Sequence, residues 1–321
     1  MARKMIVVIP QLNQTHIAAI WQAAADHGFE AEFYPTNAAA LPALPGAEIV
    51  FGHGVDLTKN APDLKWICTP MAGADAFLAP DAFLNPYAVL TNSSGAFGVA
   101  ITEHIVMVTL EMMRRQVEYL DIVRRRGWIR DLKIDTLRGK RITLLGTGDI
   151  GRVTAIRLRS FSPRRIVGVN RSGNNPNGLF DRVVTERVLD PELPETDLLI
   201  MALPATADTH HLMDRARLSL LPETAYVVNV GRGGTLDQTA LIHLLNDGRL
   251  AGASLDVFDT EPPAPDDPLW TCPRLLVTPH VAGNMMLDYT VDRVVGMFLK
   301  DFENFCAGKP LARQVDLGRG Y

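Results

Sequence analysis

The segment from Arg141 to Ser172 constrains the fold of this chain more than any other stretch. It contains the glycine pattern GTGDIG at Gly146–Gly151, directly after the apolar run Ile142–Leu145. That run is typical of a buried parallel strand. The apolar residues that follow recur at three- and four-residue spacing, as in a helix packed on a sheet, and Ile166–Val169 has the composition of a second strand. Strand, glycine turn, helix and strand within about thirty residues predict a dinucleotide-binding unit.

The three glycines of this turn, Gly146, Gly148 and Gly151, are expected to contact the cofactor. They let the backbone turn sharply and approach a pyrophosphate, whose negative charge rests at the N-terminus of the following helix. Glycine-rich turns are common, so an ordinary strand–helix turn that binds nothing is the alternative.

The composition limits the classes of protein to which the chain can belong. Its 321 residues are enough for two domains with a large buried core. Hydrophobic residues make up 47% and charged residues 21%, which is the profile of a globular protein rather than a disordered one. The formal net charge is −4 and the sequence has no extended basic block, so we expect no nucleic-acid partner and no membrane partner.

Cysteine usage and the N-terminal sequence bear on metals and on location. The three cysteines lie far apart in the sequence and predict neither a disulfide framework nor a metal cluster, so no metal is expected. No apolar run of the sequence reaches membrane-spanning length. The apolar run near the N-terminus is too short for a signal peptide and leads into periodic sequence, so the expected location is the cytoplasm.

Short apolar runs alternate with helical patterns along the chain, which predicts an α/β protein built on parallel sheets. The strands expected before the glycine unit are Met5–Ile9, Glu48–Phe51, Lys65–Cys68 and Val89–Asn92, with a helix over 15–27. A single long helix over 98–125 is expected to connect them to that unit. From residue 141 onward the pattern gives about six or seven strands, the size of a doubly wound sheet. No strand follows the last helix, over 287–305, so we expect that helix to return to the first domain.

Three further motifs stand at predicted strand ends after the glycine turn. They are Asn229–Gly234 (NVGRGG), Leu255–Pro262 (LDVFDTEP) and Val277–Gly283 (VTPHVAG). Together with GTGDIG, they resemble the D-isomer-specific 2-hydroxyacid dehydrogenase family, which includes glyoxylate/hydroxypyruvate reductases and phosphoglycerate dehydrogenases. The resemblance covers nearly the whole chain.

The resemblance implies a fold and an activity. The fold consists of two Rossmann-like domains: a smaller flavodoxin-like substrate domain over 1–97 plus 285–321, and a doubly wound, parallel-sheet NAD(P)-binding domain over 98–284. The activity is reduction of a small 2-oxo acid to the D-2-hydroxy acid by hydride transfer from NAD(P)H. Family members are usually dimers, so we expect a homodimer in which the segment 114–137 forms an intersubunit arm.

The resemblance carries the catalytic trio of the family to Arg232, Glu261 and His280. Reduction of a 2-oxo acid requires a hydride on the carbonyl carbon, a proton on its oxygen and a clamp for the carboxylate. Arginine supplies a planar, charged fork for the carboxylate, and histidine titrates near neutral pH and can deliver the proton. A carboxylate beside the imidazole fixes its orientation and favours its protonated form. Taken one at a time, the three also fit a loop arginine, an exposed carboxylate and a structural histidine.

Further family positions carry over to cofactor and substrate. Cofactor positions are Asp149 and Ile150 at the pyrophosphate, Leu203, Pro204 and Thr209 on the adenosine side, Val230 and Gly231 near the nicotinamide, Asp256 at its carboxamide, and Gly283. Substrate positions are Ala72, Gly73 and Ala74, whose amides bind the carboxylate in the family, with Arg232 and His280. His53 and Cys68, at neighbouring strand ends, are further candidates to face the cleft. The other histidines are expected at the surface or in packing, although His104 lies close to a family cofactor-contact position.

The sequence departs from the NAD-type pattern at the end of the second strand of the glycine unit. An NAD-type unit places Asp or Glu about twenty residues after the glycines to hold the ribose 2′-hydroxyl. Here the strand ends in Asn170-Arg171-Ser172, with no acid. A neutral residue removes the repulsion against a 2′-phosphate, and Arg171 with Ser172 offers it partners. We therefore expect these three residues to bind the cofactor and NADP(H) to be favoured over NAD(H).

Two other functions fit the same architecture. Formate dehydrogenases share it, but their trio has a glutamine in the role that falls here to Glu261. A dinucleotide-sensing binding protein without significant turnover, as in the related C-terminal binding co-repressors, is the alternative from a different class. The intact trio argues against that alternative.

Overall fold

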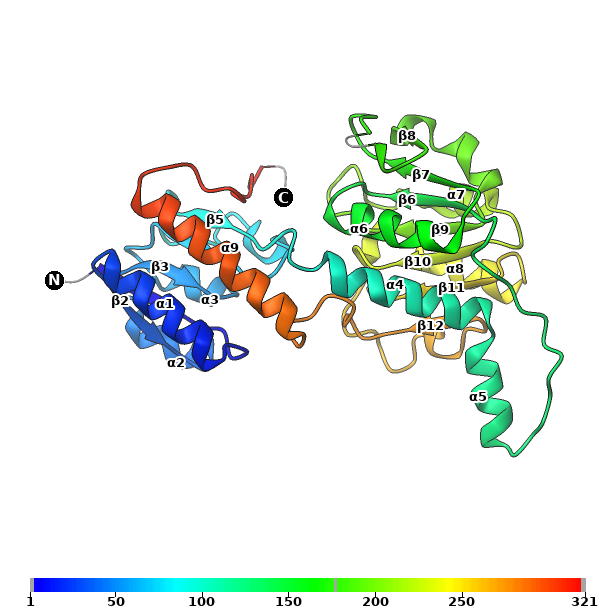
Figure 1. The fold of residues 1–321 in the computed structure, drawn as a ribbon, viewed down its shortest axis with the longest axis horizontal. Helices are drawn as coiled ribbons and strands as arrows, with labels where there is room; N and C mark the ends of the chain where they lie inside the picture. The colour runs from blue at the N-terminus through cyan, green and yellow to red at the C-terminus, as the bar shows by residue number, and fades with distance from the viewer. Residues whose placement is uncertain (1–2, 176–177, 319–321) are drawn as a thin grey trace. The chain divides into compact units, whose positions relative to one another are not determined.

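The computed structural model of the protein describes residues 3–175 and 178–318, and the chain divides into two compact units. The first unit combines residues 1–97 with 285–321, and the second covers residues 98–284 (Figure 1). Each unit is built on an entirely parallel sheet flanked by helices, which confirms the predicted α/β class. No helix in the described ranges is both long and apolar enough to cross a membrane.

The first unit has a five-stranded sheet in the order β2-β1-β3-β4-β5. Its strands are β1 (Arg3–Val7), β2 (Phe29–Phe33), β3 (Ala47–Phe51), β4 (Trp66–Cys68) and β5 (Val89–Thr91). This strand order, 2-1-3-4-5, is the flavodoxin-like arrangement that the resemblance implied.

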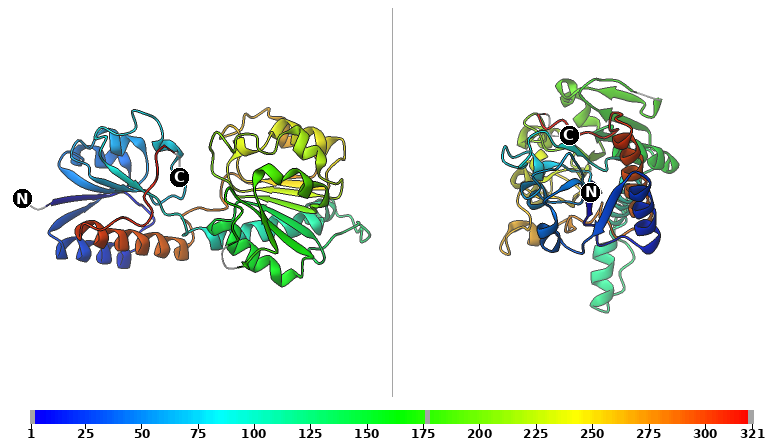
Figure 2. Two further views of the ribbon diagram at one scale, coloured as in Figure 1. Left: turned by 90° about the horizontal axis from the view of Figure 1, so that it is seen from above. Right: turned by 90° about the vertical axis from the view of Figure 1, so that its left-hand side faces the viewer.

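Helices cover both faces of this first sheet. Helices α1 (Gln14–Asp26) and α9 (Asp288–Cys306) lie side by side on one face, and α2 (Asn37–Ala40) and α3 (Val55–Lys59) cover the other (Figure 2). In α9, Phe298 stacks on Phe51 of β3 with ring centroids 4.0 Å apart and on Trp66 of β4 at 5.3 Å. The last helix of the chain therefore supplies part of the aromatic core under the first sheet.

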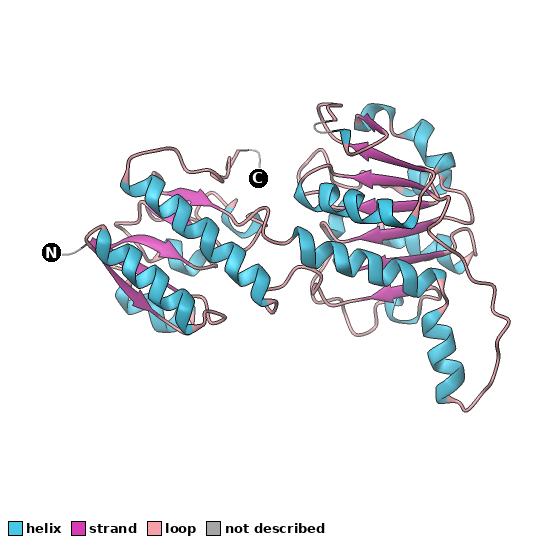
Figure 3. Ribbon diagram, viewed as in Figure 1, coloured by secondary structure: helices cyan, strands magenta, loops and turns pink. Residues whose placement is uncertain are grey.

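The second unit has a seven-stranded sheet in the order β12-β11-β10-β9-β6-β7-β8. Its strands are β6 (Arg141–Leu145), β7 (Arg165–Val169), β8 (Arg182–Val184), β9 (Leu198–Met201), β10 (Tyr226–Asn229), β11 (Gly252–Leu255) and β12 (Leu275–Val277). Helices α4 (Gly98–Met113) and α6 (Asp149–Leu158) cover one face, and α7 (Arg215–Leu220) and α8 (Gln238–Asn246) cover the other (Figure 3). Both faces are buried, which explains why these strands are continuous apolar runs in the sequence.

The parallel register of the second sheet aligns the last residues of neighbouring strands. In the order β7-β6-β9-β10-β11-β12 the aligned residues are Val169, Leu145, Met201, Asn229, Leu255 and Val277. The loops that follow these residues therefore begin side by side along one edge of the sheet. The strand order reverses between β6 and β9, which is the switch point where open α/β sheets bind ligands.

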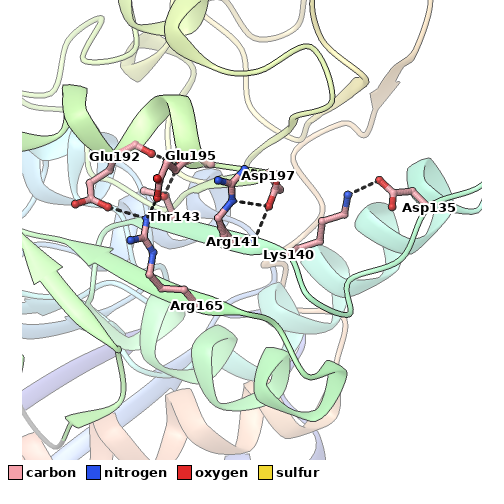
Figure 4. A network of polar contacts seen from close by, with 9 residues as sticks. Asp135, Lys140, Arg141, Thr143, Arg165, Glu192, Glu195 and Asp197 are labelled. Carbon is pink, nitrogen blue, oxygen red and sulfur yellow. Dashed lines mark hydrogen bonds and ion pairs between the residues drawn. The ribbon is translucent and has the colours of Figure 1, made fainter.

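Ion pairs hold the opposite edge, at the amino ends of the same strands (Figure 4). Arg141 of β6 binds Asp197 at 3.0 Å. Arg165 of β7 binds Glu192 at 3.0 Å and Glu195 at 3.3 Å, and the Glu192 side chain is only 5% exposed. This edge contains none of the predicted site residues, and we assign its contacts to stability.

The structure differs from the expected elements in three places. The single helix expected over 98–125 is wrong: Arg115 adopts the left-handed backbone region with φ of 55° and separates α4 from α5 (Gln116–Arg124). Helix α5 contains no buried residue, so tertiary packing does not hold it in line with α4. Strand β2 was not predicted from the sequence, because only Phe29 of its five residues is buried. The short strand β8 was not predicted either.

Candidate active site

The glycine turn between β6 and α6 has the geometry that its sequence predicts. Gly146 has a left-handed φ of 101°, and a Cβ there would lie 2.6 Å from the carbonyl oxygen of Ala202, after β9. A Cβ at Gly151 would lie 2.0 Å from the carbonyl oxygen of Gly146. Side chains are therefore excluded at both positions, and α6 starts in direct contact with the turn.

The N-terminus of α6 is suited to an anion. Its N-cap, Gly148, has no side chain to satisfy the first amides, and a Cβ placed there would meet nothing within 4 Å. The amides of Asp149 and Ile150 donate no hydrogen bond to any described residue. Unsatisfied amides at a helix N-terminus beside open space fit a pyrophosphate, so the residues present fit a dinucleotide.

Asn170, at the end of β7, ties its own loop to the glycine turn. Its Nδ2 donates to Thr147 Oγ1 at 2.7 Å and to the carbonyl oxygen of Asn174 at 2.9 Å. Its Oδ1 accepts from the amide of Gly173 at 2.7 Å and from Ser172 Oγ at 3.3 Å. The amide side chain is thus engaged within the protein, so its effect on a ligand acts through the shape of the loop. Arg171 and Ser172, the next two residues of that loop, are both exposed.

The loop after β9 closes on itself and meets the loop after β10. Thr209 Oγ1 donates to the carbonyl oxygen of Pro204 at 2.7 Å and accepts from the amide of Thr206 at 2.9 Å. A Cβ at Gly231 would lie 2.6 Å from the carbonyl oxygen of Leu203. The predicted adenosine-side and nicotinamide-side positions therefore belong to two loops in direct backbone contact. The remaining predicted positions, Val230 and Gly283, lie directly after β10 and in the loop after β12.

Arg232 follows β10, and a buried asparagine holds its backbone. Asn229 is fully buried; its Nδ2 donates to the carbonyl oxygen of Arg232 at 3.1 Å, and its Oδ1 accepts from the amide of Gly231 at 3.1 Å. The hydroxyl of Thr235 also donates to the Arg232 carbonyl at 2.7 Å. Asn229 was not among the predicted site residues, although a polar residue at the end of an apolar strand is a usable signal.

Gly233 brings the arginine loop against the loop that carries the predicted glutamate. A Cβ at Gly233 would lie 1.9 Å from the carbonyl carbon of Phe258 and 2.5 Å from the amide nitrogen of Asp259. The two backbones are thus closer than any side chain permits. Only glycine at this position lets Arg232 and Glu261 stand on touching loops.

Glu261 and His280 form a hydrogen-bonded pair. His280 Nδ1 lies 2.7 Å from Glu261 Oε2, and Glu261 Oε1 accepts from the amide of Phe258 at 3.0 Å. A carboxylate only accepts, so Nδ1 carries the hydrogen and Nε2 is left to exchange a proton with a ligand. Both side chains are partly exposed, at 48% for His280 and 35% for Glu261, so a ligand can reach them.

The loop that carries His280 is anchored by a buried carboxylate. Asp256, directly after β11, is 2% exposed. Its Oδ1 accepts from the amide of Val281 and its Oδ2 accepts from the amide of Ala282, each at 2.9 Å. These contacts give Asp256 a role in the protein itself; its expected contact with a nicotinamide carboxamide stays a prediction.

In the first unit, the loop after β4 presents unpaired amides. The N–H groups of Ala72, Gly73 and Ala74 donate no hydrogen bond within the described ranges. The carbonyl of Ala72 accepts from Asn92 Nδ2 at 2.9 Å, and that of Ala74 accepts from the amide of Phe77 at 2.9 Å. Free amides with satisfied carbonyls are the pattern of an anion-binding loop.

The two further candidates in the first unit differ in their surroundings. His53 Nδ1 lies 2.8 Å from Thr69 Oγ1, and its ring meets Phe77 edge-on with centroids 5.5 Å apart. Partial burial lowers the pKa of His53, against the opposing charges of two nearby aspartates. The expectation that Cys68 faces a cleft is wrong, because its side chain belongs to the core. Burial raises the pKa of the Cys68 thiol to about 12.

Comparison with known proteins gives the family. The family model described as "D-isomer specific 2-hydroxyacid dehydrogenase, NAD binding domain" matches residues 106–282. A glyoxylate reductase from Thermofilum pendens is 35% identical over 234 residues, which cover 71% of this chain and 68% of that protein. The chain belongs to the D-isomer specific 2-hydroxyacid dehydrogenase family and is an oxidoreductase.

Two solved structures share the whole architecture. A D-isomer specific 2-hydroxyacid dehydrogenase family protein from Aeromonas salmonicida superposes with a TM-score of 0.86 at 29% identity, covering 99% of this chain and 100% of that one. An NADPH-dependent glyoxylate/hydroxypyruvate reductase from Sinorhizobium meliloti, in complex with NADP and sulfate, superposes with a TM-score of 0.82 at 28% identity, covering 99% of each chain. The predicted family and fold are therefore confirmed.

Proposed function

We propose that this enzyme reduces a small 2-oxo acid to the D-2-hydroxy acid and prefers NADPH as the reductant. The observation that carries the proposal is the Glu261–His280 pair, 2.7 Å apart. Glu261 stands on a loop in backbone contact with the arginine loop, and both residues of the pair follow strands at the sheet edge that also holds the glycine turn. Glyoxylate and hydroxypyruvate are the first substrates to test, because relatives of this chain carry those names.

The residues of the chain divide the work of the reaction. The nicotinamide, when bound, supplies a hydride for the carbonyl carbon. His280 donates a proton from Nε2 to the carbonyl oxygen, and Glu261 keeps the hydrogen on Nδ1 and stabilises the imidazolium. Arg232 binds the substrate carboxylate and polarises the carbonyl with its fixed positive charge. In the reverse direction His280 recovers the proton.

We assign the two units different ligands. The second unit, over 98–284, is the NAD(P)-binding domain, with the pyrophosphate at the N-terminus of α6. The first unit is the substrate domain, in which the unpaired amides of Ala72, Gly73 and Ala74 bind a carboxylate. This assignment is testable by adding a substrate analogue such as oxamate to the whole enzyme and measuring the NMR chemical shifts of these three backbone amides.

The preference for NADP(H) rests on the loop after β7. Asn170 fills the position where an acid would repel a 2′-phosphate, and its four hydrogen bonds hold the loop that presents Arg171 and Ser172. The Sinorhizobium relative is an NADPH-dependent reductase, in keeping with this proposal. Steady-state kinetics with both coenzymes test it, and a higher kcat/KM with NADH would refute it.

The alternative is a dinucleotide-binding protein without significant turnover. Loss of absorbance at 340 nm with NADPH and glyoxylate, hydroxypyruvate, pyruvate or phenylpyruvate separates the two functions. We expect turnover with at least one of these acids. Tight NADPH binding without turnover on the whole panel would favour the sensor instead.

We also propose that the enzyme is a homodimer joined through the segment 114–137. Helix α5, within this segment, has no buried residue in the chain described, and its apolar Val123 is 62% exposed. Beyond it, the Trp128 side chain is 85% exposed. A second copy would cover these side chains. Light scattering should give twice the chain mass, and Val123→Glu with Trp128→Glu should give the monomer; a wild-type monomer would overturn the proposal.

A further inference from the structure

A histidine outside the trio contacts the loop that carries His280. His104 lies on α4 and is 9% exposed. Its Nε2 lies 3.3 Å from the hydroxyl of Thr278, the residue directly after β12 and two residues before His280. All of these residues belong to the second unit.

The hydrogen-bond roles in this contact follow from the next partner. Thr278 Oγ1 donates to Asp256 Oδ1 at 2.6 Å, and a carboxylate only accepts. The single hydrogen of the hydroxyl is thus used, so the oxygen must accept from His104. His104 therefore carries its hydrogen on Nε2, and the three side chains form a chain of bonds that runs one way, from His104 through Thr278 to Asp256.

This chain of bonds ends on the backbone next to His280. Asp256 accepts from the amides of Val281 and Ala282, both at 2.9 Å. His280 itself adopts a left-handed φ of 52°, which is unfavourable for a residue with a side chain and persists only when its surroundings hold it. The segment from Thr278 to Ala282 is thus held from both sides of His280 by one carboxylate.

We propose that His104 is a positioning residue for His280: by donating to Thr278 it orients the hydroxyl toward Asp256, which fixes the backbone on both sides of His280. The catalytic consequence rests on the proposed function, but the effect on the loop does not. His104 need not touch substrate or cofactor to act in this way.

The burial of His104 favours a neutral donor. Burial lowers the pKa of His104, and the negative charges of Asp256 and Glu111 act in the opposite direction. In the neutral ring, the hydrogen on Nε2 leaves Nδ1 without one. Nδ1 makes no hydrogen bond within the described ranges, so Nε2 is the functional atom of the side chain.

A matched pair of variants isolates that hydrogen bond. His104→Gln keeps an N–H donor near the position of Nε2, whereas His104→Met has nearly the same shape without the donor. In the full-length enzyme without substrate, we expect the amides of Val281 and Ala282 to exchange hydrogen about five- to tenfold faster in the Met variant, because one hydrogen bond is lost. The Gln variant should restore exchange to nearly the wild-type rate.

Threonine variants test whether the effect passes through the hydroxyl. Thr278→Val should speed exchange of the same amides, and adding His104→Met to it should have no further effect. The control is Thr109→Val on the same helix, because the buried hydroxyl of Thr109 has no partner among the described residues. That control should leave exchange unchanged.

Kinetics provide the second measurement. With NADPH and glyoxylate or hydroxypyruvate, His104→Met should lower kcat about tenfold with little change in the KM for NADPH, and His104→Gln should recover most of it. Equal behaviour of the Met and Gln variants, or additive effects of His104→Met and Thr278→Val, would overturn the proposal. Faster exchange in the Met variant, together with a wild-type enzyme that turns over no acid, would instead refute the proposed function and leave the positioning role standing.

Discussion

Gly233 offers the sharpest test of the site geometry. In Gly233→Ala the new Cβ would lie 1.9 Å from the carbonyl carbon of Phe258 and 2.0 Å from its carbonyl oxygen. Non-bonded carbon atoms prefer about 3.5 Å, so the arginine loop and the glutamate loop must separate by roughly 1.5 Å. Both groups in contact are backbone and neither has a rotamer to change. Overpacking of this kind costs about 1–3 kcal/mol of stability, and misplacement of a catalytic group by about 1 Å costs about 100-fold in rate.

The neighbouring glycine is the matched control for this substitution. A Cβ at Gly234 would lie 3.6 Å from His210 Nδ1, an ordinary contact, so Gly234→Ala should behave like wild type. We expect Gly233→Ala to lose about 100-fold in kcat/KM with NADPH and glyoxylate, and to unfold at lower temperature in calorimetry. Wild-type activity in Gly233→Ala, or equal losses in both variants, would show that the backbone approach does not position Arg232 against Glu261.

Three further outcomes follow from the site and from the ion pairs. His280→Ala should lower kcat by about 1,000-fold while the Kd for NADPH, measured by fluorescence, stays within about twofold; surviving activity would disprove the proton-donor role. Arg171→Ala should raise the KM for NADPH about tenfold and leave that for NADH nearly unchanged, and equal changes would count against a 2′-phosphate contact. Burial alone would raise the pKa of Asp197, but hydrogen bonds from the side chain and amide of Arg141 lower this pKa overall. The ionised form of Asp197 therefore stabilises the fold above the ordinary carboxyl pKa, and this contribution is lost as the pH falls through the lower pKa of the folded state. Asp197→Asn should therefore cost about 1 kcal/mol in urea unfolding at pH 7 and progressively less as the pH falls below the ordinary carboxyl pKa, and a cost independent of pH would argue against the ion pair.

The sequence predicts the edge on which the site lies because strand ends are local features. Apolar runs stop where the chain leaves a buried parallel sheet, and residues such as Gly146, Asn170 and His280 stand just after such stops. Parallel pairing then brings all of those ends to one edge. Composition and spacing alone did not pair Glu261 with His280; the family resemblance suggested the pair, and the structure shows the 2.7 Å contact.

Other features could not be predicted because they depend on packing between distant segments. The left-handed backbone of Arg115 splits the long helix, and no glycine or proline at this point of the sequence predicts the break. The approach of Gly233 to Phe258 brings together residues from two loops. In a loop with several glycines, the sequence does not reveal which glycine contacts another loop. The chain of bonds from His104 to Asp256 spans a helix and two strand ends, and no local pattern in the sequence connects these residues.

The ion pairs at the amino ends of the strands have a practical consequence for altering this enzyme. Strand β6 carries Arg141 at one end and runs directly into the glycine turn at the other, so about 17 Å of rigid, paired backbone separates the two. The ion pairs that contribute to stability and the loops that bind the coenzyme therefore lie at opposite ends of the same strands. Charge changes around Arg165 and Glu192 can retune heat and salt resistance, whereas the loops at the other edge can be varied for a new substrate against an unchanged scaffold.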